Sequence, residues 1–393
     1  MKILYHFRTR GVGVEAVHIA GIAAAFERMG HQVDFSSPVG VDPRRTVQGK
    51  TSAKSMRSAF YGAIARHCPG WIFEFLELGY NLVAWSRNAR LLRRSGYDLV
   101  FERHAFFLFS TAWLARRQGI PLVVEVNELV GDERVRKQPF MAPLVRACDR
   151  FTFARASLIV AVSPHIQRRI QAQGVDDCRL VVLPNAVNEL TFSELASPEP
   201  VRCRYGFGHS VVLGFIGGLS AWHRLDLLIE VFGRLRQRDL DVRLMIVGDG
   251  VEREALAGVA RRAGVLEQTL FVGQVSHAEI PSYIAAMDVG VVPHSNEYRS
   301  PIKLFEYMGQ GKAVVAPRTE PIAAVVRSEV NGLLFEPGSG DGLSGALERL
   351  IRDAGLRQRL GEQARQDVLR KHTWTQNART ILNRLSSSTG ARG

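Results

Sequence analysis

The chain has 393 residues, of which 51 are Lys or Arg and 38 are Asp or Glu, so its formal net charge is +13. This length suffices for two domains of ordinary size, and an apolar content of 46% is typical of a globular protein and argues against a disordered one. The positive charge favours polyanionic partners, which include nucleotide phosphates, nucleic acid and an anionic membrane surface.

The chain carries no pattern of a secreted or membrane-spanning protein. Its first residues, MKILYHF, read directly as a strand without a signal peptide, and the longest apolar stretch, AFFLFSTAWLA, is too short to cross a bilayer. The four cysteines, Cys68, Cys148, Cys178 and Cys203, form no C-x-x-C pair. We therefore expect reduced thiols, no zinc site and a cytoplasmic location, with peripheral attachment to the inner face of a membrane as an option.

The first half opens as a doubly wound α/β unit. A strand at residues 2–7 leads through a glycine-bearing turn, RTRGVGVEAV, into an apolar-periodic helix at residues 17–30, and residues 31–37 form the next strand. Gly11 and Gly13 would let the backbone approach a ligand closely. A tight turn without a ligand explains the same two glycines, so both interpretations stay open.

Residues 41–96 differ from the rest, because basic residues alternate with aromatic ones in a helical pattern. One interpretation is an amphipathic cover that holds the acceptor or an anionic membrane surface. The other is a pair of ordinary helices with solvated basic faces. Neither interpretation is excluded by the residues themselves.

The remainder of the first half continues the alternation of strands and helices, with strands near residues 97–104, 120–128, 157–163 and 180–188. Ligands bind at the carboxyl ends of strands in open α/β sheets. The polar residues at two of these ends are Glu102, Arg103, His104, Glu125, Asn127 and Glu128.

The domain organisation follows from these patterns. Residues 1–188 form one parallel-sheet domain, the Pro- and Ser-bearing residues 189–208 are a linker, and residues 209–370 form a second α/β domain. A helix occupies residues 371–387, and residues 388–393 are a disordered tail. The string Asp239-Leu240-Asp241 lies between a helix and a strand, at the wrong end of that strand for a ligand, so we interpret it as a turn and expect no metal site.

The stretch RSPIKLFEYMGQGKAVVAP, residues 299–317, follows a buried-strand pattern and predicts a helix. Ser300 is placed as its N-cap and Pro301 as its first helical residue. The start of such a helix presents free N–H groups that suit a phosphate. Lys303 and Glu306 share one face, where the cation would add charge and the carboxylate could accept bonds from a ribose diol. An ordinary, well-capped helix is the alternative.

This stretch resembles the phosphate- and ribose-binding segment of retaining glycosyltransferases of family 4, through Ser300, Pro301, Lys303, Glu306, Tyr307, Met308 and Gly311. The resemblance implies the GT-B fold: α/β, with two Rossmann-like parallel-sheet domains facing a cleft. The first domain would bind the acceptor and the second the nucleotide sugar. Two departures stand out, since Lys312 replaces a frequent proline and Tyr298, with Glu297 beside it, stands where the family has a first glutamate.

Other segments extend the resemblance. The first glycine turn and helix are similar to the family's G-G-x-E and G-H-x-V elements, and the segment FIGGLSAWHR is similar to its diphosphate-binding segment. His223 matches a phosphate-contacting position, whereas Arg224 replaces the usual glycine. The resemblance also implies that the final helix, which carries Trp374, crosses back to the first domain. The donor-binding residues it implies are Gly11, Gly13, Gly218, Gly248, Asp249, Gln274, Val275, Ser300, Pro301, Ile302 and Glu306.

On the acceptor side, the candidates are Glu15, Arg103, His104, Asn127 and Glu128, where Asn127 takes the place of a histidine that is frequent in the family. His223, Lys303 and Arg224 would stabilise the leaving diphosphate without a metal. The implied donor is a UDP-sugar, with GDP-mannose as an option, and the acceptor is an unidentified hydroxyl in glycan, glycolipid or other glycoconjugate synthesis. The rival functions are a non-hydrolysing sugar-nucleotide epimerase and a nucleic-acid-binding protein.

Overall fold

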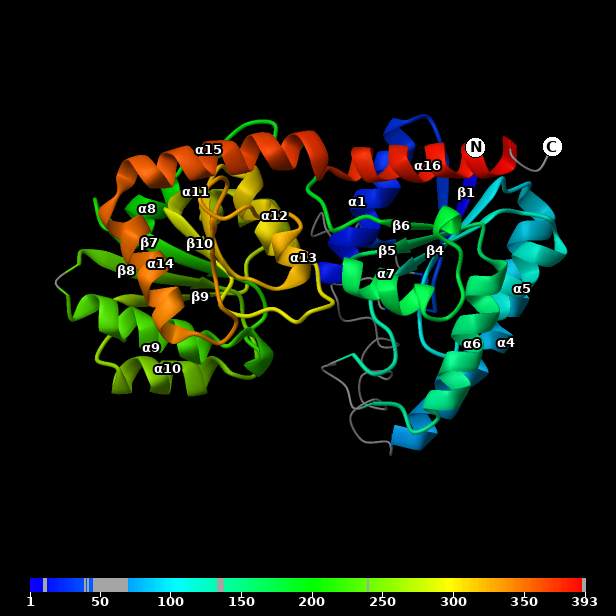
Figure 1. Cartoon of the computed structure of the whole chain (residues 1–393), viewed down its shortest axis with the longest axis horizontal. Helices are drawn as coiled ribbons and strands as arrows, with labels where there is room; N and C mark the ends of the chain where they lie inside the picture. Colours follow the sequence, from blue (N-terminus) through cyan, green and yellow to red (C-terminus); the bar gives the residue numbers. More distant parts are fainter. Residues whose placement is uncertain are drawn as a thin grey trace. The chain divides into compact units, whose positions relative to one another are not determined.

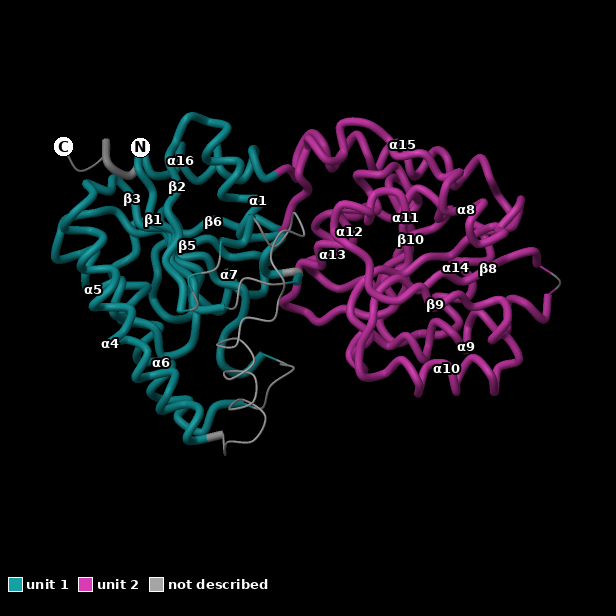
Figure 2. Tube along the Cα trace, turned by 180° about the vertical axis from the view of Figure 1, so that it is seen from behind, with its two compact units in different colours: residues 1–184, 374–393 teal, residues 185–373 magenta. Residues whose placement is uncertain are grey.

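The computed structural model describes residues 1–9, 13–38, 40, 42–44, 70–132, 138–238 and 240–390. The chain divides into two compact units, which Figure 2 shows in different colours. Unit 1 comprises Met1–Pro184 and Trp374–Gly393, and unit 2 comprises Asn185–Thr373.

Unit 1 is built on a parallel sheet with the strand order β2-β1-β3-β4-β5-β6. The strands are β1 (Lys2–His6), β2 (Gln32–Ser36), β3 (Leu99–Arg103), β4 (Leu122–Val126), β5 (Leu158–Ala161) and β6 (Leu180–Val182). Its helices are α1 (Val14–Arg28), α4 (Gly70–Ser95), α5 (Ser110–Arg117), α6 (Ala142–Arg155), α7 (Pro164–Gln171), the 3₁₀ turn η1 (Asp177–Arg179) and α16 (Trp374–Gly390).

The apolar strands of unit 1 require cover on both faces of the sheet, which is usual for parallel sheets. All five residues of β4 are buried, for example. Helices α4, α5 and α6 lie together on one face, whereas α1 and α16 pack against each other on the opposite face (Figure 1). Because the helices cover the two faces of the sheet, polar loops occupy the carboxyl ends of the strands.

Unit 2 repeats this plan with the strand order β12-β11-β10-β7-β8-β9. The strands are β7 (Val211–Ile216), β8 (Val242–Val247), β9 (Thr269–Gly273), β10 (Val289–Val291), β11 (Ala313–Pro317) and β12 (Leu333–Phe335). Its helices are α8 (Glu199–Tyr205), α9 (Leu225–Arg236), α10 (Arg253–Arg262), α11 (Ile280–Ala286), α12 (Ile302–Gly309), α13 (Glu320–Ala323), α14 (Gly340–Arg352) and α15 (Ala354–Lys371), with 3₁₀ turns η2 (Ala221–His223) and η3 (His277–Glu279).

Two hydrophobic cores sandwich the sheet of unit 2, because successive strand residues point to opposite faces. In β7, Leu213 and Phe215 join the core under α9, α10 and α14. Val212 and Ile216 join the core under α11 and α12. The prediction of two parallel α/β domains is confirmed by these two sheets.

Several boundaries lie elsewhere than the sequence suggested. Residues 189–208, expected as a linker, contain α8 and bury Phe192 and Val201 in a core of unit 2, because these apolar side chains match its surface. Helix α16 begins at Trp374 and continues to Gly390, past the expected start of the tail at residue 388. No helix within the described residues is long and apolar enough to cross a membrane.

Candidate functional site

The candidate site lies where the strand order of unit 2 reverses, between β7 and β10. The segments that leave these two strands diverge at that point, and the gap at the carboxyl edge is where open α/β sheets bind ligands. The segment after β7 carries Gly217, Gly218 and His223, and the segment after β10 leads to Arg299, Ser300 and helix α12. Most of the predicted donor-binding residues therefore meet at one sheet edge.

Lys303, in the first turn of α12, is held directly over the end of β7. Its Nζ lies 3.8 Å from the centre of the Phe215 ring, a cation–π contact, and 3.3 Å from Nδ1 of His223. A Cβ at Gly217 would lie only 2.7 Å from this ammonium, and the backbone there has φ of +147°. Glycine at this position therefore makes room for the lysine beside the loop after β7.

Arg299 is a further cation at this place, and the sequence did not single it out. Its guanidinium lies over the Trp222 ring at 4.3 Å, and its Nε donates to the Tyr298 hydroxyl at 2.9 Å. The His223 ring lies against the same Trp222 ring at a tilt of 34°, with the ring centres 3.5 Å apart. Arg299 immediately precedes the Ser300–Pro301 pair of the family motif. This position next to the motif is the one sequence signal that could have pointed to it.

The positive charges in this cluster repel one another. Burial lowers the pKa of Lys303 well below its ordinary value, Arg299 lowers it further, and Glu306 works in the opposite direction. Burial, followed by Lys303, Arg299 and His294, lowers the pKa of His223 to about 2. His223 is therefore a neutral imidazole near pH 7, and a bound anion would relieve the repulsion between the cations.

Glu306 lies one turn further along α12 and is 8% exposed. No hydrogen bond reaches its carboxylate from the part of the chain that the structure describes. Burial raises its pKa to about 7, although Lys303 lowers it. A buried carboxyl group without a partner suits a ligand that supplies hydroxyl donors.

Tyr307 fixes the helix that carries both residues. Its hydroxyl accepts a hydrogen bond from the backbone N–H of Ile216 at 2.8 Å, at the end of β7. Its ring lies against Gly290 of β10, where an added Cβ would come within 2.5 Å of the ring. The sequence matched Tyr307 to a motif without giving it this anchoring role.

The predicted capping of α12 is wrong. The helix begins at Ile302, its N-cap is Pro301 in an extended conformation, and no side chain caps it. Ser300 lies one residue outside, where its Oγ accepts from the Asn185 N–H at 2.9 Å and its carbonyl accepts from the Asn185 side chain. Ser300 therefore ties the helix start to the segment that opens unit 2. The helix stops at Gly309.

Arg224 does not join the cation cluster. Its backbone is left-handed, with φ of 51°, which explains why a glycine suits this position. Its Nε donates to both carboxylate oxygens of Asp226, each at 3.2 Å, and the pair is exposed. Among the described residues, no hydrogen bond or ion pair joins the Arg224 side chain to Lys303 or His223.

The loops after β7, β8 and β9 line the same edge. The N–H groups of Gly217 and Leu219 donate to Val247 and Asp249, and a Cβ at Gly248 would collide with the Gly217 carbonyl. Gly218 is exposed, with only the Asp249 carbonyl within 4 Å of an added Cβ. The remaining donor candidates there are Asp249 and Gln274, which are exposed, and Val275, which is half-buried.

In unit 1, two of the predicted acceptor residues, Arg103 and Asn127, bond to Glu125 near the end of β4. Arg103 donates to Glu125 at 3.1 Å, and Glu125 also contacts His18 at 2.6 Å. Burial opposes ionisation of Glu125, but His18 and Arg103 lower its pKa to about 2. Asn127 approaches the same carboxylate at 3.5 Å. These pairs fix the edge of β3 and β4.

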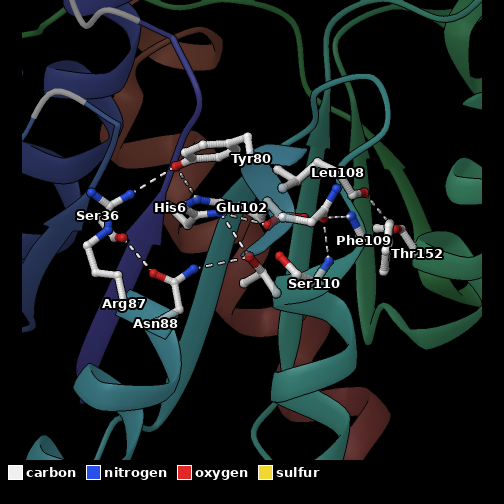
Figure 3. Close-up of polar contacts among 12 residues, drawn as sticks. His6, Ser36, Tyr80, Arg87, Asn88, Glu102, Leu108, Phe109, Ser110 and Thr152 are labelled. Atoms are coloured by element: carbon white, nitrogen blue, oxygen red, sulfur yellow. Dashed lines mark hydrogen bonds and ion pairs between the residues drawn. The ribbon is translucent and has the colours of Figure 1, made fainter. Parts of the chain in front are cut away.

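The side chains of two further residues at the end of β3 are buried in pairs with other residues of unit 1. His104 contacts Asp149 through Nε2 at 2.8 Å, with both side chains almost fully buried. Glu102 contacts His6 at 2.8 Å, and the ring also approaches Thr111 and Tyr80, as Figure 3 shows for most of this network. We interpret both pairs as structural supports beneath the sheet edge.

The other predicted positions are more open. Gly13 and Glu15, at the start of α1, are exposed, whereas Gly11 lies outside the described residues. Glu128 is half-buried at the end of β4. Tyr298 is 3% exposed, so it does not present a free polar group in place of the family's first glutamate, and Glu297 beside it is exposed.

Among the described residues, no group of three or more His, Cys, Asp or Glu side chains is arranged to hold a metal ion. Asp241, from the D-x-D string, accepts a hydrogen bond from Ser210 at 2.7 Å before the start of β8. Asp239 lies outside the described residues. Asp241 thus lies at the edge of the sheet opposite the candidate site.

Comparison with known proteins identifies the class of protein to which this chain belongs. The model of the group 1 glycosyl transferases matches residues 207–367, and that of glycosyltransferase family 4 matches residues 13–189. The chain belongs to this family of glycosyltransferases, which confirms the resemblance seen in the sequence.

Relatives and solved structures agree with this assignment. An uncharacterized glycosyltransferase of Methanocaldococcus jannaschii is 22% identical over 387 residues, which cover 97% of this chain and 96% of the relative. A D-inositol 3-phosphate glycosyltransferase of Kribbella flavida is 28% identical over 334 residues, covering 78% and 76%.

The solved structures define the fold. Anabaena Alr3699/HepE in complex with UDP has a TM-score of 0.75 at 20% identity, over 98% of this chain and 100% of that one. Sucrose-phosphate synthase from Thermosynechococcus elongatus has a TM-score of 0.74 at 14% identity, over the full length of both chains. The fold is therefore GT-B, as predicted.

Proposed function

We propose that this glycosyltransferase transfers a hexosyl unit from a nucleotide-diphosphate sugar to an acceptor hydroxyl, with retention of anomeric configuration and without a metal ion. The observation that carries the proposal is the convergence of Lys303, His223 and Arg299 at the β7–β10 switch point. Glu306 lies one helical turn away, unpaired among the described residues and buried.

The cluster suits a leaving diphosphate. Cleavage of the sugar–phosphate bond places growing negative charge on the diphosphate, and fixed donors in a dry site stabilise that charge most effectively. The Lys303 ammonium donates to Nδ1 of His223, which leaves the imidazole proton on Nε2 as a second donor to a phosphate oxygen. Arg299 supplies a third donor group, and the amides that open α12 supply more.

Retention needs no protein nucleophile in this scheme. The leaving phosphate accepts the proton of the acceptor hydroxyl on the same face of the sugar, which the family resemblance supports. The chain's role is to hold the diphosphate, the sugar and the acceptor together and to neutralise charge. Glu306 accepts hydrogen bonds from the ribose diol, which also offsets the cost of its burial.

A panel of nucleotide-sugar donors tests which nucleotide base and which sugar the enzyme accepts. UDP-sugars are the first choice, because Anabaena Alr3699/HepE has been solved with UDP and with UDP-glucose. GDP-mannose is the second. Each donor is incubated with and without candidate hydroxyl acceptors, and nucleotide release is measured. Acceptor-dependent release supports a transferase, whereas an epimerised donor formed without acceptor supports the epimerase instead.

The first prediction concerns Lys303. Removing one donor to a developing anion costs about 2 to 4 kcal/mol of barrier, so we expect Lys303→Ala to lose at least about tenfold in turnover. Lys371→Ala is the matched control, because it removes the same charge from an exposed position of unit 2. Circular dichroism checks the fold of both variants. Near-normal turnover of a folded Lys303→Ala protein contradicts the assignment.

A further inference from the structure

Helix α4 presents a broad apolar face to solvent. At 100° per residue its exposed apolar side chains fall on about half of the helix circumference. Each of them is between 44% and 75% exposed. They are Trp71, Phe75, Leu76, Leu82, Val83 and Trp85.

The same arc of α4 ends in cations. Arg90, Arg93 and Arg94 are exposed in its last turns and continue the line of the apolar residues. The two carboxylates of the helix point elsewhere: Glu74 accepts from the backbone N–H groups of Phe140 and Met141, and Glu77 pairs with Arg8. The outer face of α4 therefore carries positive charge and no exposed carboxylate.

The neighbouring helices extend this face. Helix α5 packs between α4 and α6, and the three lie along one side of unit 1 in both views (Figures 1 and 2). The one carboxylate on α5 and α6, Asp149, is buried against His104. The exposed residues that these helices and the turn before α6 add are Trp113, Phe140 and Leu144, which are apolar, and Arg116, Arg117, Arg146 and Arg150.

Ordinary surface chemistry explains only part of this pattern. Arginines in the last turn of α4 and α5 complement the helix dipole. Single exposed apolar residues are common on soluble proteins. Six on one arc of a single helix, with further exposed aromatic residues on α5 and before α6, exceed this pattern, and exposed apolar patches mark interaction surfaces.

We propose that the outer face of α4, α5 and α6 docks on the surface of an anionic lipid bilayer. Aromatic and aliphatic side chains would enter the boundary between headgroups and acyl chains, while the arginines would pair with lipid phosphates. Charge decides between a lipid and a protein partner, because a face with seven exposed arginines and no exposed carboxylate matches a uniformly anionic surface. A helix of 26 residues, about 39 Å long, would lie in the plane of the surface.

The test is co-sedimentation of the full chain with vesicles, made of phosphatidylcholine alone or of phosphatidylcholine mixed with phosphatidylglycerol. We expect binding to the mixed vesicles only, and a loss of binding as salt is raised. The variant Arg90→Ser/Arg93→Ser/Arg94→Ser should lower partitioning by about 100-fold, since each basic residue contributes about fivefold. The control Arg204→Ser/Arg261→Ser/Arg262→Ser removes the same exposed charge from unit 2 and should bind as the wild type does.

A second pair of variants tests the apolar part. Phe75→Ser/Leu82→Ser/Val83→Ser should lower partitioning at least tenfold, and its exposed positions leave the core intact. Leu190→Ser/Leu195→Ser/Val251→Ser, exposed in unit 2, is the control. Sedimentation velocity without vesicles completes the test. Equal binding to both vesicle types, or a dimer that only the α4 variant dissociates, overturns the proposal.

Discussion

Single charged residues set the chemistry of the candidate site, and each is held at an energetic cost. The ammonium of Lys303 lies beside a neutral imidazole and near a guanidinium, so its pKa is lowered, first by burial and then by Arg299. An anion in front of this cluster favours the protonated lysine and raises its pKa again. Binding of a nucleotide diphosphate should therefore be linked to proton uptake by Lys303.

This linkage gives the second prediction. Above the lowered pKa of Lys303 in the free protein, each binding event must take up a proton, so affinity for UDP falls as pH rises, by up to about tenfold per unit. Titration calorimetry across neutral and alkaline pH measures it. Lys303→Met should bind weakly and lose this slope, while ionisation of the nucleotide affects both proteins alike. Parallel slopes for wild type and variant would contradict the linkage.

Glu306 carries the third prediction. Burial raises its pKa from 4.5 to about 7 in the folded protein, so between these values the folded state binds more protons than the unfolded state. Stability is therefore lost as pH rises through this window, and a shift of this size corresponds to about 3 kcal/mol. Glu306→Gln should raise the free energy of unfolding by about 2 to 3 kcal/mol at pH 8 and change it little at pH 5.

Urea denaturation at both pH values measures this effect, with Glu297→Gln, an exposed acid nearby, as the control. Glu306→Gln should also raise the Michaelis constant for the donor more than it lowers turnover, because the ribose contact is made both in the bound ground state and during the reaction. A variant of unchanged stability at pH 8 would mean that water or another group already satisfies the carboxylate.

The sequence predicted individual site residues unevenly. The family motif places Lys303, His223 and Glu306 at one helix start and one loop, and the structure brings Lys303 and His223 to 3.3 Å from each other. Arg299 and Asn185 were missed, because their contacts with Trp222 and Ser300 join segments that are distant in the chain. Arg224 was placed in the cluster by its neighbour His223, yet its left-handed backbone and its bond to Asp226 take it elsewhere.

At the scale of elements, α12 is positioned by its contacts with the sheet. Local cues suggested that Ser300 would cap the helix, but tertiary contacts use its hydroxyl for the Asn185 N–H. The strands were easier to predict, because continuous apolar runs such as those of β5 and β11 have few alternatives in a parallel sheet. Exact helix starts depend on partners from other segments, which periodicity does not reveal.

The fourth prediction tests how α12 is anchored. Tyr307→Phe removes the acceptor for the Ile216 N–H, and a buried donor without a partner costs about 1 to 3 kcal/mol. We expect this loss in urea denaturation, together with weaker UDP binding, because Lys303 and Glu306 are on the same helix. Tyr205→Phe, whose hydroxyl is only weakly bonded to Tyr283 at 3.5 Å, is the control. Unchanged stability and affinity would mean that ring packing alone holds α12.

At the scale of the whole molecule, the chain leaves unit 1 at Pro184, builds unit 2 and returns to unit 1 at Trp374. The returning helix α16 is fixed by Trp374, which is 2% exposed and lies with its ring 4.7 Å from that of His18. Gly21 of α1 allows this approach, since a Cβ there would collide with the indole. The stability of unit 1 therefore depends on the last part of the chain.

The fifth prediction follows from this arrangement. Trp374→Ala should cost unit 1 about 3 to 5 kcal/mol, the usual loss for a buried tryptophan. Trp85→Ala, at a position that is 44% exposed, is the matched control and should cost far less. Because two units need not unfold together, calorimetry should show one transition moving to lower temperature. The transition that UDP stabilises should stay in place, because unit 2 contains the proposed donor site. If the UDP-sensitive transition shifts by the same amount, the units unfold as one, and Trp374 contributes to the stability of the whole chain.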